Sequence, residues 1–492
     1  MRSAVKQFDI LVIGAGSAGC ALVGRVVESS GMSVGLVEGG PDYGPASGRG
    51  WPTELLDPRR FPKTHDWGLV QPRAKVIGGC SSHNQCAVVR AIPGDFDRWA
   101  AAGNRGWGDK DLAPFLRDIE YRLPLRQYRD DELAFWQKCF LEAAAAAGFP
   151  RVQELSDPAS PEGVAPFHAN LRDSIRWNAA FAFLDAVRER STFSIVADTV
   201  ADRLVFKGRR AVALTGYSPD GAIELRAHRF VVCAGVYGSP AILMRSGIGP
   251  PDALQKLRIP IHVPLAGVGS NLHDHPGIAI DYEPSPSARR AFESELADNR
   301  LYQSQVILKA LTDRRQEESL LHVLPYQAPD ESGAWRFVLM VFVMRPWSRG
   351  SVRLSGPDPH DAVQIDFNFV SDPAGHDLAA LTAGVRLIRG IAKVPPLDHA
   401  IRREIAPGHL LDSTAERIRF IRSRAAGYAH AVGTCHMGPS SEAGDVVDAN
   451  GLVYGTENVF VADASIIPEI PRANTNLTCM LIGRKLAELL HT

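Results

Sequence analysis

The sequence predicts a two-part fold, an α/β unit with a parallel sheet and an α+β region built on an antiparallel sheet. Three observations predict it. Residues 8–38 show a strand, a glycine loop, a helix and a second strand in succession. A later apolar stretch, 230–234, ends at glycine and precedes a helix start at 238–240. Between 276 and 425, strands group together beside helices, which is typical of α+β structure rather than further βαβ repeats.

The N-terminal stretch Phe8–Ile13 is an apolar run, short enough for one buried strand. Residues 14–19 are Gly-Ala-Gly-Ser-Ala-Gly, and a helix of small residues is expected through about Glu28. A second apolar run, Met32–Val37, ends on Glu38. This order predicts a Rossmann-like dinucleotide-binding unit. The first glycine makes the turn, the second admits a pyrophosphate, and the third lets helix and strand pack closely.

The acid after the second strand limits the choice of dinucleotide. A carboxylate at Glu38 can accept hydrogen bonds from both hydroxyls of an adenosine ribose, and it disfavours a 2′-phosphate. The ligand is therefore expected to be FAD or NAD rather than NADP, and the glycine pattern does not separate these two. The candidate cofactor contacts in this unit are Gly14, Gly16, Ser17, Ala18, Gly19, Glu38 and Gly39.

Length and composition bound the class of protein. A chain of 492 residues allows about three domains, or two large ones. Hydrophobic residues at 45% and charged residues at 22% are ordinary for a soluble globular protein. The net charge of -1 gives no nucleic-acid footprint. No run reaches the roughly 18 apolar residues needed to span a bilayer.

The cysteines give no sign of a disulfide framework or a zinc ribbon. Seven are scattered along the chain, at Cys20, Cys80, Cys86, Cys139, Cys233, Cys435 and Cys479. Asp9 interrupts the first apolar run early, and glycines follow it, so that run does not resemble a signal peptide. We therefore expect a soluble, reduced, cytoplasmic protein.

Other segments carry weaker patterns. Residues 39–62 are expected to form a surface loop with at most a short helix, and 97–120 ends in a helical pattern. The tract 75–86 places two glycines before small hydroxyl and thiol residues, where backbone can lie flat against a planar ligand. Strands are expected at 337–344, and a helix closes the chain at 478–490.

Ten tracts along the chain form a series: GAGSAG, LVEGG, KVIGGCSSHN, DRWAAAGNRGWG, DSIRWNAAFAFL, VVCAGVYGSPAILMRSGIG, VGSNLHDHP, SRGSVRL, AHAVGTCHMG and VFVADASIIP. In this order and spacing the chain resembles the glucose–methanol–choline (GMC) oxidoreductase family. Its members are FAD enzymes, so the resemblance implies FAD. It also implies a discontinuous FAD-binding domain over 1–155, 190–280 and 426–492. A substrate-binding domain over 156–189 and 281–425 is implied beside it, with helices flanking an antiparallel sheet.

The resemblance implies further flavin contacts, at Gly78, Gly79, Ser82, His83, Asn84, Ala234, Gly235, Asp463, Ala464 and Asn476. The tract containing His83 is most similar to choline oxidase-like members, in which this histidine is bonded to the flavin 8-methyl group. Covalent attachment through His83 is therefore expected, with a noncovalent contact as the alternative. The run His273-Asp274-His275 is structural or near the flavin in the family, so no metal is expected there.

Two residues are expected to carry the chemistry. By resemblance, His430 matches the catalytic histidine of the family and Asn476 its second catalytic position. His430 can titrate near neutrality and would accept the hydroxyl proton or hold the alkoxide, while Asn476 would orient the substrate oxygen. The implied reaction is FAD-dependent oxidation of an alcohol to an aldehyde or ketone by hydride transfer. Oxygen or another acceptor would reoxidise the flavin.

Alternatives stay open at this stage. The same fold hosts hydroxynitrile-lyase-like and light-driven decarboxylase activities, and a flavoprotein carrier without turnover is a third possibility. Choline is disfavoured as substrate, because a quaternary ammonium group needs a carboxylate or an aromatic cage. The substrate-domain glutamate and the additional active-site histidine of the choline enzyme are replaced here, near Gln303 and Arg345. Tyr428 would instead narrow the pocket for another alcohol. Arg345 would favour an anionic or polar substrate, unless it is solvated. The substrate, the electron acceptor and the oligomeric state are not defined by the sequence.

Overall fold

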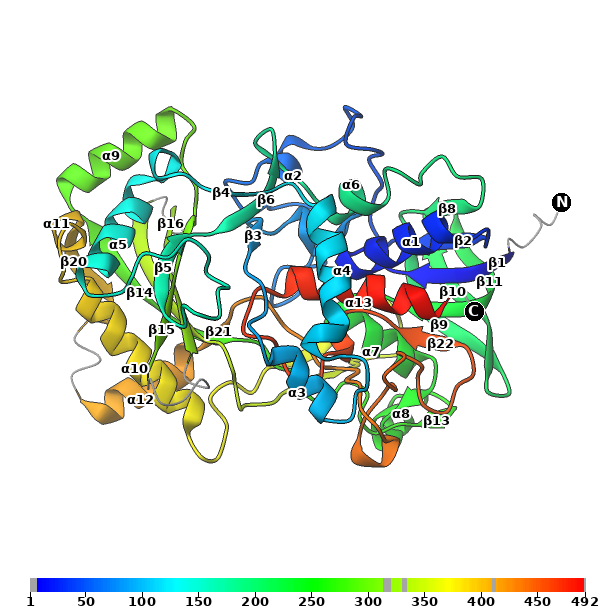
Figure 1. The fold of residues 1–492 in the computed structure, drawn as a ribbon. Helices are drawn as coiled ribbons and strands as arrows, with labels where there is room; N and C mark the ends of the chain where they lie inside the picture. Colours follow the sequence, from blue (N-terminus) through cyan, green and yellow to red (C-terminus); the bar gives the residue numbers. More distant parts are fainter. Residues whose placement is uncertain (1–6, 313–319, 330–333, 409–412, 491–492) are drawn as a thin grey trace.

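The computed structural model describes residues 7–312, 320–329, 334–408 and 413–490, arranged around two large sheets at opposite ends of the molecule (Figure 1). The first sheet has the order β8-β2-β1-β11-β10-β9, with β22 beside β11. Its strands are β1 (Gln7–Ile13), β2 (Val34–Val37), β8 (Phe193–Val196), β9 (Val200–Lys207), β10 (Arg210–Ser218), β11 (Gly221–Val232) and β22 (Val459–Val461).

The half of this sheet formed by β8, β2, β1, β11 and β22 is parallel, and β9 and β10 continue it in antiparallel fashion. Strand β2 is buried along its whole length, as the apolar run up to Val37 predicts. Because the parallel strands end at one edge, the loops after β1, β11 and β22 meet there. The predicted strand–loop–helix–strand succession is confirmed, with helix α1 spanning Ser17–Ser29.

Helices cover this sheet on both faces and pack closely against each other. The closing helix α13 (Thr475–Leu489) lies along α1, and α4 (Asp109–Arg122) lies on α13. At Gly483 of α13 an added Cβ would lie 2.2 Å from the carbonyl oxygen of Ala18. The other helices near this sheet are α2 (Thr53–Leu56), α3 (Asp95–Ala101), α6 (Ala179–Phe183), α7 (Gly235–Arg245) and α8 (Pro251–Lys256).

The second sheet is antiparallel throughout, in the order β20-β14-β17-β16-β15-β5, with β21 beside β14. Its strands are β5 (Gly163–Pro166), β14 (Pro276–Pro284), β15 (Val306–Leu311), β16 (Leu320–Pro329), β17 (Trp335–Val343), β20 (Ile401–Ala406) and β21 (Ala426–Gly427). Its helices are α5 (Phe135–Ala146), α9 (Pro286–Ala297), α10 (His376–Ile391), α11 (Leu397–Ala400) and α12 (Thr414–Arg424). The predicted antiparallel sheet flanked by helices is confirmed.

Strand β17 shows how the two faces of this sheet differ. Phe337 stacks on Trp136 of α5, with 4.3 Å between ring centroids. Phe342 points the other way and stacks on Tyr428 at 4.0 Å. In the ladder Phe342 pairs with His322 of β16, which pairs with Lys309 of β15. These three side chains therefore form one row on the face turned away from α5.

Small sheets complete the fold. Their strands are β3 (Ala87–Val88), β4 (Leu125–Gln127), β6 (His168–Arg172), β7 (Ile175–Arg176), β12 (Ile248–Gly249), β13 (Val263–Pro264), β18 (Ser351–Arg353) and β19 (Gln364–Asp366). Within the described residues no helix is both long and apolar enough to cross a membrane.

Each large sheet has its own hydrophobic core, and two helices pack in a core other than the one that the expected domain boundaries assign to them. Helix α5 packs in the core of the second sheet, although it lies within 1–155. Helix α6 packs in the core of the first sheet, although it lies within 156–189. Each helix follows its apolar residues: Trp136 and Phe140 of α5 are fully buried against one core, and Phe183 of α6 against the other.

A glycine pair tests the close packing of α1 on α13. We expect Gly483→Ala to lower the free energy of unfolding by about 2 kcal/mol, because its methyl group overlaps backbone that cannot move alone. In the matched control Gly390→Ala, at an exposed position of α10, no atom lies within 4 Å of the new Cβ. That variant should be unchanged or slightly more stable. Equal Tm values for the two holoenzyme variants would contradict the packing argument.

Candidate active site

The three glycines of the loop between β1 and α1 have different surroundings. Gly14 has a φ of +108°, and a Cβ there would lie 2.4 Å from the Cys233 carbonyl oxygen. At Gly19 a Cβ would lie 2.0 Å from the Gly14 carbonyl oxygen. At Gly16, by contrast, no other atom lies within 4 Å of that position. The loop is therefore tightly packed on two sides and open at the middle glycine, where a pyrophosphate can approach.

Two further groups face this loop. Glu38 at the end of β2 accepts hydrogen bonds from the backbone N–H of Ala15 and of Gly40, both at 2.9 Å. Burial raises the pKa of Glu38 to about 7, and these hydrogen bonds oppose the rise. Gly79 lies directly against the loop, since a Cβ there would be 2.6 Å from Gly16 Cα. The tract 75–86 thus covers the glycine loop.

A pocket runs from Glu38 past the glycine loop to Ala429 and Ala431, which flank His430. Eleven predicted cofactor contacts line it: Gly14, Gly16, Ser17, Ala18, Glu38, Gly39, Gly79, Ala234, Gly235, Asp463 and Ala464. Six others lie outside its lining: Gly19, Gly78, Ser82, His83, Asn84 and Asn476. Sequence reasoning missed several lining residues: Trp67, Arg73 and Cys479 lie in no quoted motif, and Tyr237 and Arg245 lie in the tract 231–249 without having been singled out.

The side chains of several predicted cofactor contacts form hydrogen bonds with the protein's own backbone. The Ser82 hydroxyl donates to the Ile77 carbonyl at 3.0 Å, and Asn84 Oδ1 accepts from the Cys86 N–H at 2.9 Å. Asp463 Oδ2 accepts from the Gly235 N–H at 2.8 Å. Asp463 therefore joins the end of β22 to the start of α7, and its contact with a ribityl hydroxyl stays a prediction.

His83 follows the 3₁₀ helix η1 (Gly79–Ser82) and is 6% exposed. Its Nε2 has no hydrogen-bond partner among the described residues. Burial, followed by the nearby guanidinium of Arg176, lowers the pKa of His83, and a hydrogen bond with the Thr64 backbone opposes this. The imidazole is therefore neutral at pH 7 and keeps an unshared pair of electrons on Nε2.

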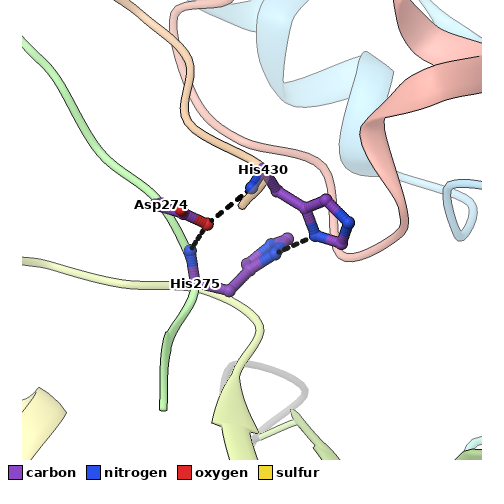
Figure 2. A group of neighbouring side chains, drawn as sticks. All are labelled: Asp274, His275 and His430. Carbon is purple, nitrogen blue, oxygen red and sulfur yellow. Dashed lines mark hydrogen bonds between the residues drawn. The ribbon is translucent and has the colours of Figure 1, made fainter. Parts of the chain in front are cut away.

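Asp274 holds the loop that carries His430 (Figure 2). Its Oδ1 accepts hydrogen bonds from the backbone N–H of His275 at 2.7 Å and of His430 at 3.0 Å. Its Oδ2 accepts from Gln71 Nε2 at 2.8 Å. Although Asp274, His275 and His430 lie close enough to ligate a metal, the carboxylate is already engaged by three N–H donors. The trio is organised as a hydrogen-bonded cluster.

The imidazoles of His275 and His430 form a directed chain. His275 Nε2 lies 3.1 Å from the Pro471 carbonyl oxygen, which can only accept, so Nε2 carries the proton. Burial lowers the pKa of His275 to about 3, so its Nδ1 is an acceptor at neutral pH. Nδ1 of His430 lies 3.1 Å away and donates to it. These assignments follow from the hydrogen-bond network.

The same reasoning fixes the other nitrogen of His430. Burial, with His275 and His322 nearby, lowers the pKa of His430 well below its usual value, so the ring is neutral. Because Nδ1 carries the proton, Nε2 is an acceptor, and it accepts a hydrogen bond from Asn474 Nδ2 at 3.2 Å. Nε2 is therefore the nitrogen of His430 that can act as a base.

The amide bonded to His430 is Asn474, whereas Asn476, the expected second catalytic residue, makes another contact. Asn476 Oδ1 accepts from the Ser17 hydroxyl at 2.6 Å, in the glycine loop. The reason lies in helix α13, which begins at Thr475, three residues before the predicted start at Thr478. Asn474 is its N-cap and Asn476 its second residue, so the two side chains point to different places.

These features define a dinucleotide-binding protein in which a histidine and an amide lie beside the cofactor pocket. The N-terminal family model for GMC oxidoreductases matches residues 8–277, and the C-terminal model matches 346–483. The chain belongs to the GMC oxidoreductase family, which confirms the predicted resemblance. It is therefore an FAD-dependent oxidoreductase of this family.

Similar proteins match over nearly the whole chain. The oxygen-dependent choline dehydrogenase of Pectobacterium atrosepticum is 31% identical over 98% of this chain and 94% of its own length. That of Pseudomonas savastanoi pv. phaseolicola is 32% identical over 98% and 93%. Pyridoxine 4-oxidase from Mesorbium loti has a TM-score of 0.84 and 28% identity, covering 98% of this chain and 99% of its own. An Aspergillus oryzae formate oxidase, at 22% identity and TM-score 0.84 over 99% and 98%, shares the fold.

Proposed function

We propose that this enzyme oxidises an alcohol to an aldehyde or ketone, with FAD as hydride acceptor and oxygen or another electron acceptor reoxidising it. The observation that carries the proposal is the hydrogen bond between Asn474 Nδ2 and His430 Nε2, 3.2 Å long, next to Ala429 and Ala431 of the cofactor pocket lining. An alcohol that replaces this hydrogen bond can give its proton to Nε2 and accept the amide N–H. The names of similar proteins, which act on choline and pyridoxine, support an alcohol substrate.

The described residues fit FAD. The open face of Gly16 admits a pyrophosphate, the Glu38 carboxylate is placed for the ribose, and the pocket lining includes Asp463 and the two neighbours of His430. When bound there, flavin supplies a two-electron acceptor for the hydride. We infer that the first sheet belongs to the FAD-binding domain, with α6, and the second to the substrate-binding domain, with α5.

His430 and Asn474 divide the work on the hydroxyl group. His430 Nε2 takes the proton, because His275 and the Pro471 carbonyl keep the ring proton on Nδ1. The resulting imidazolium donates to His275 Nδ1, which stabilises the new charge. Asn474 donates its amide N–H to the substrate oxygen as negative charge develops on it.

The reaction itself is tested by following the flavin absorbance of the purified protein without oxygen. Bleaching on addition of primary alcohols, secondary alcohols, polyols or amino alcohols is expected, and admission of air then tests oxygen as acceptor. If a flavin-loaded protein is bleached by none of them, alcohol oxidation is contradicted. Hydroxynitrile-lyase-like cleavage and light-driven decarboxylation are the alternatives that would then be assayed.

The two asparagines give a matched pair of variants. We expect Asn474→Ala to slow flavin reduction by the best alcohol about 10²- to 10³-fold, as loss of one oxyanion donor does, with unchanged flavin content. Asn476→Ala should leave that rate within about threefold, because it loses a bond to Ser17, but release FAD more readily. Rapid-scan reduction and flavin retention during gel filtration measure these effects. The reverse outcome would return the catalytic role to Asn476.

We further propose that FAD is bonded to His83. The buried, neutral imidazole offers a free electron pair on Nε2, and no described residue competes for it. The Nε2–carbon bond would replace one C–H bond of the 8-methyl group; the methyl proton and the ring proton on Nδ1 would leave to solvent, and two electrons would pass to the acceptor that reoxidises the enzyme. Such a bond makes the flavin more oxidising.

Denaturation separates the covalent and noncovalent alternatives. In the unchanged protein we expect the yellow colour to stay with the precipitate in acid, and flavin fluorescence to follow the polypeptide on a denaturing gel. His83→Ala should release all of its flavin. His399→Ala, on the exposed end of α11, should behave like the unchanged protein. Release of flavin from the unchanged protein would show that the contact is noncovalent.

A further inference from the structure

His322 on β16 is a buried polar side chain that the proposed reaction does not use. It has no exposed surface, and neither Nδ1 nor Nε2 has a hydrogen-bond partner among the described residues. An unpaired buried polar group is costly, and a bound ligand can recover that cost. Its ring centroid lies 6.4 Å from that of Tyr428, whose ring is 4.2 Å from His430. His322 therefore lies near the proposed base, with Tyr428 in contact with both.

Lys309 lies beside His322 on the same face of the sheet. The two residues are direct partners in the antiparallel β15–β16 ladder, so their Cβ atoms are roughly 5 Å apart. Lys309 is 2% exposed, and Nζ donates to the Ser160 carbonyl at 2.9 Å. Among the described residues no carboxylate lies within 4.0 Å of Nζ. An ammonium has three donors, so two N–H groups are available to a ligand.

The charge on Lys309 itself favours an anion. Burial lowers the pKa of Lys309 to about 8, opposed by Asp157 and Glu154, so the ammonium is charged at neutral pH. Glu154 is itself bonded to Arg90 at 2.9 Å, and Arg472 nearby is bonded to Asp95 at 2.7 Å. His275 and His430 are neutral, so the ammonium of Lys309 is the charge that this pair offers to a ligand.

We propose that Lys309 and His322 form a subsite for a carboxylate at the far end of the alcohol substrate. This inference rests on the proposed oxidation at His430 and Asn474. Lys309 supplies the charge and His322 a neutral ring N–H, and the two oxygens of one carboxylate can accept both. A quaternary ammonium group would meet a buried positive charge instead. The substrate class is therefore a hydroxy acid, in contrast to the choline named for similar dehydrogenases.

Binding without turnover tests the subsite directly. Acetate and benzoate are titrated into the holoenzyme and their binding is followed by the shift of flavin absorbance, with acetamide, benzamide and benzyltrimethylammonium as matched probes. We expect at least one carboxylate to bind tenfold or more tightly than its amide, and Lys309→Met to abolish the difference. Lys256→Met, on the exposed side of α8, should keep it. His322→Phe should reduce it severalfold, and this variant serves also if Lys309→Met does not fold.

Turnover gives an independent comparison. The ratio of kcat/KM for 4-(hydroxymethyl)benzoate over benzyl alcohol should exceed ten and fall toward one in Lys309→Met. Equal binding of both carboxylates and their amides, or a preference unchanged in both Lys309→Met and His322→Phe, would overturn the subsite. If carboxylates bind through Lys309 while no alcohol bleaches the flavin, the proposed oxidation fails and the subsite stands. If alcohols bleach the flavin without this preference, only the subsite fails.

Discussion

The Asp274 carboxylate is the contact on which the active site depends. It binds the backbone N–H of His275 and His430 on one side and the Gln71 amide on the other. Backbone hydrogen bonds between 273–275 and 428–432 run alongside. This clamp holds Ala429 at a φ of +69°, which non-glycine residues rarely adopt. The direction of the His430 side chain thus follows from one buried acid, and backbone strain is retained where function needs it.

In the same cluster the Pro471 carbonyl determines, through His275, which nitrogen of His430 can accept a proton. The Pro471 carbonyl assigns the proton of His275, His275 assigns that of His430, and the free electron pair is left facing Asn474. Burial lowers the pKa of both rings, so neither is charged before the substrate arrives. The site therefore begins neutral and becomes charged only as the alcohol loses its proton, where that charge is useful.

The sequence predicts most of the fold, because periodicity and glycine spacing are local signals. The first βαβ unit and β17 follow from such patterns, while the antiparallel arrangement of the second sheet follows from the family resemblance. The site was harder to predict. Asn474 and Asn476 are two residues apart, and which of them contacts His430 depends on where α13 begins. His322 and Lys309 carry no motif at all, since their importance comes from strand register, a pairing between distant segments.

The alternation of side chains along the second sheet separates two kinds of constraint. One face of β17 presents Phe337 to Trp136 and holds the sheet to its helices, while the other presents Phe342 to Tyr428, whose ring contacts that of His430. Substitutions on the row that faces Tyr428 can thus change the surroundings of His430 without disturbing the packing behind it. A scaffold of this kind can diversify during evolution, acquiring new substrates residue by residue while its architecture and its redox chemistry persist.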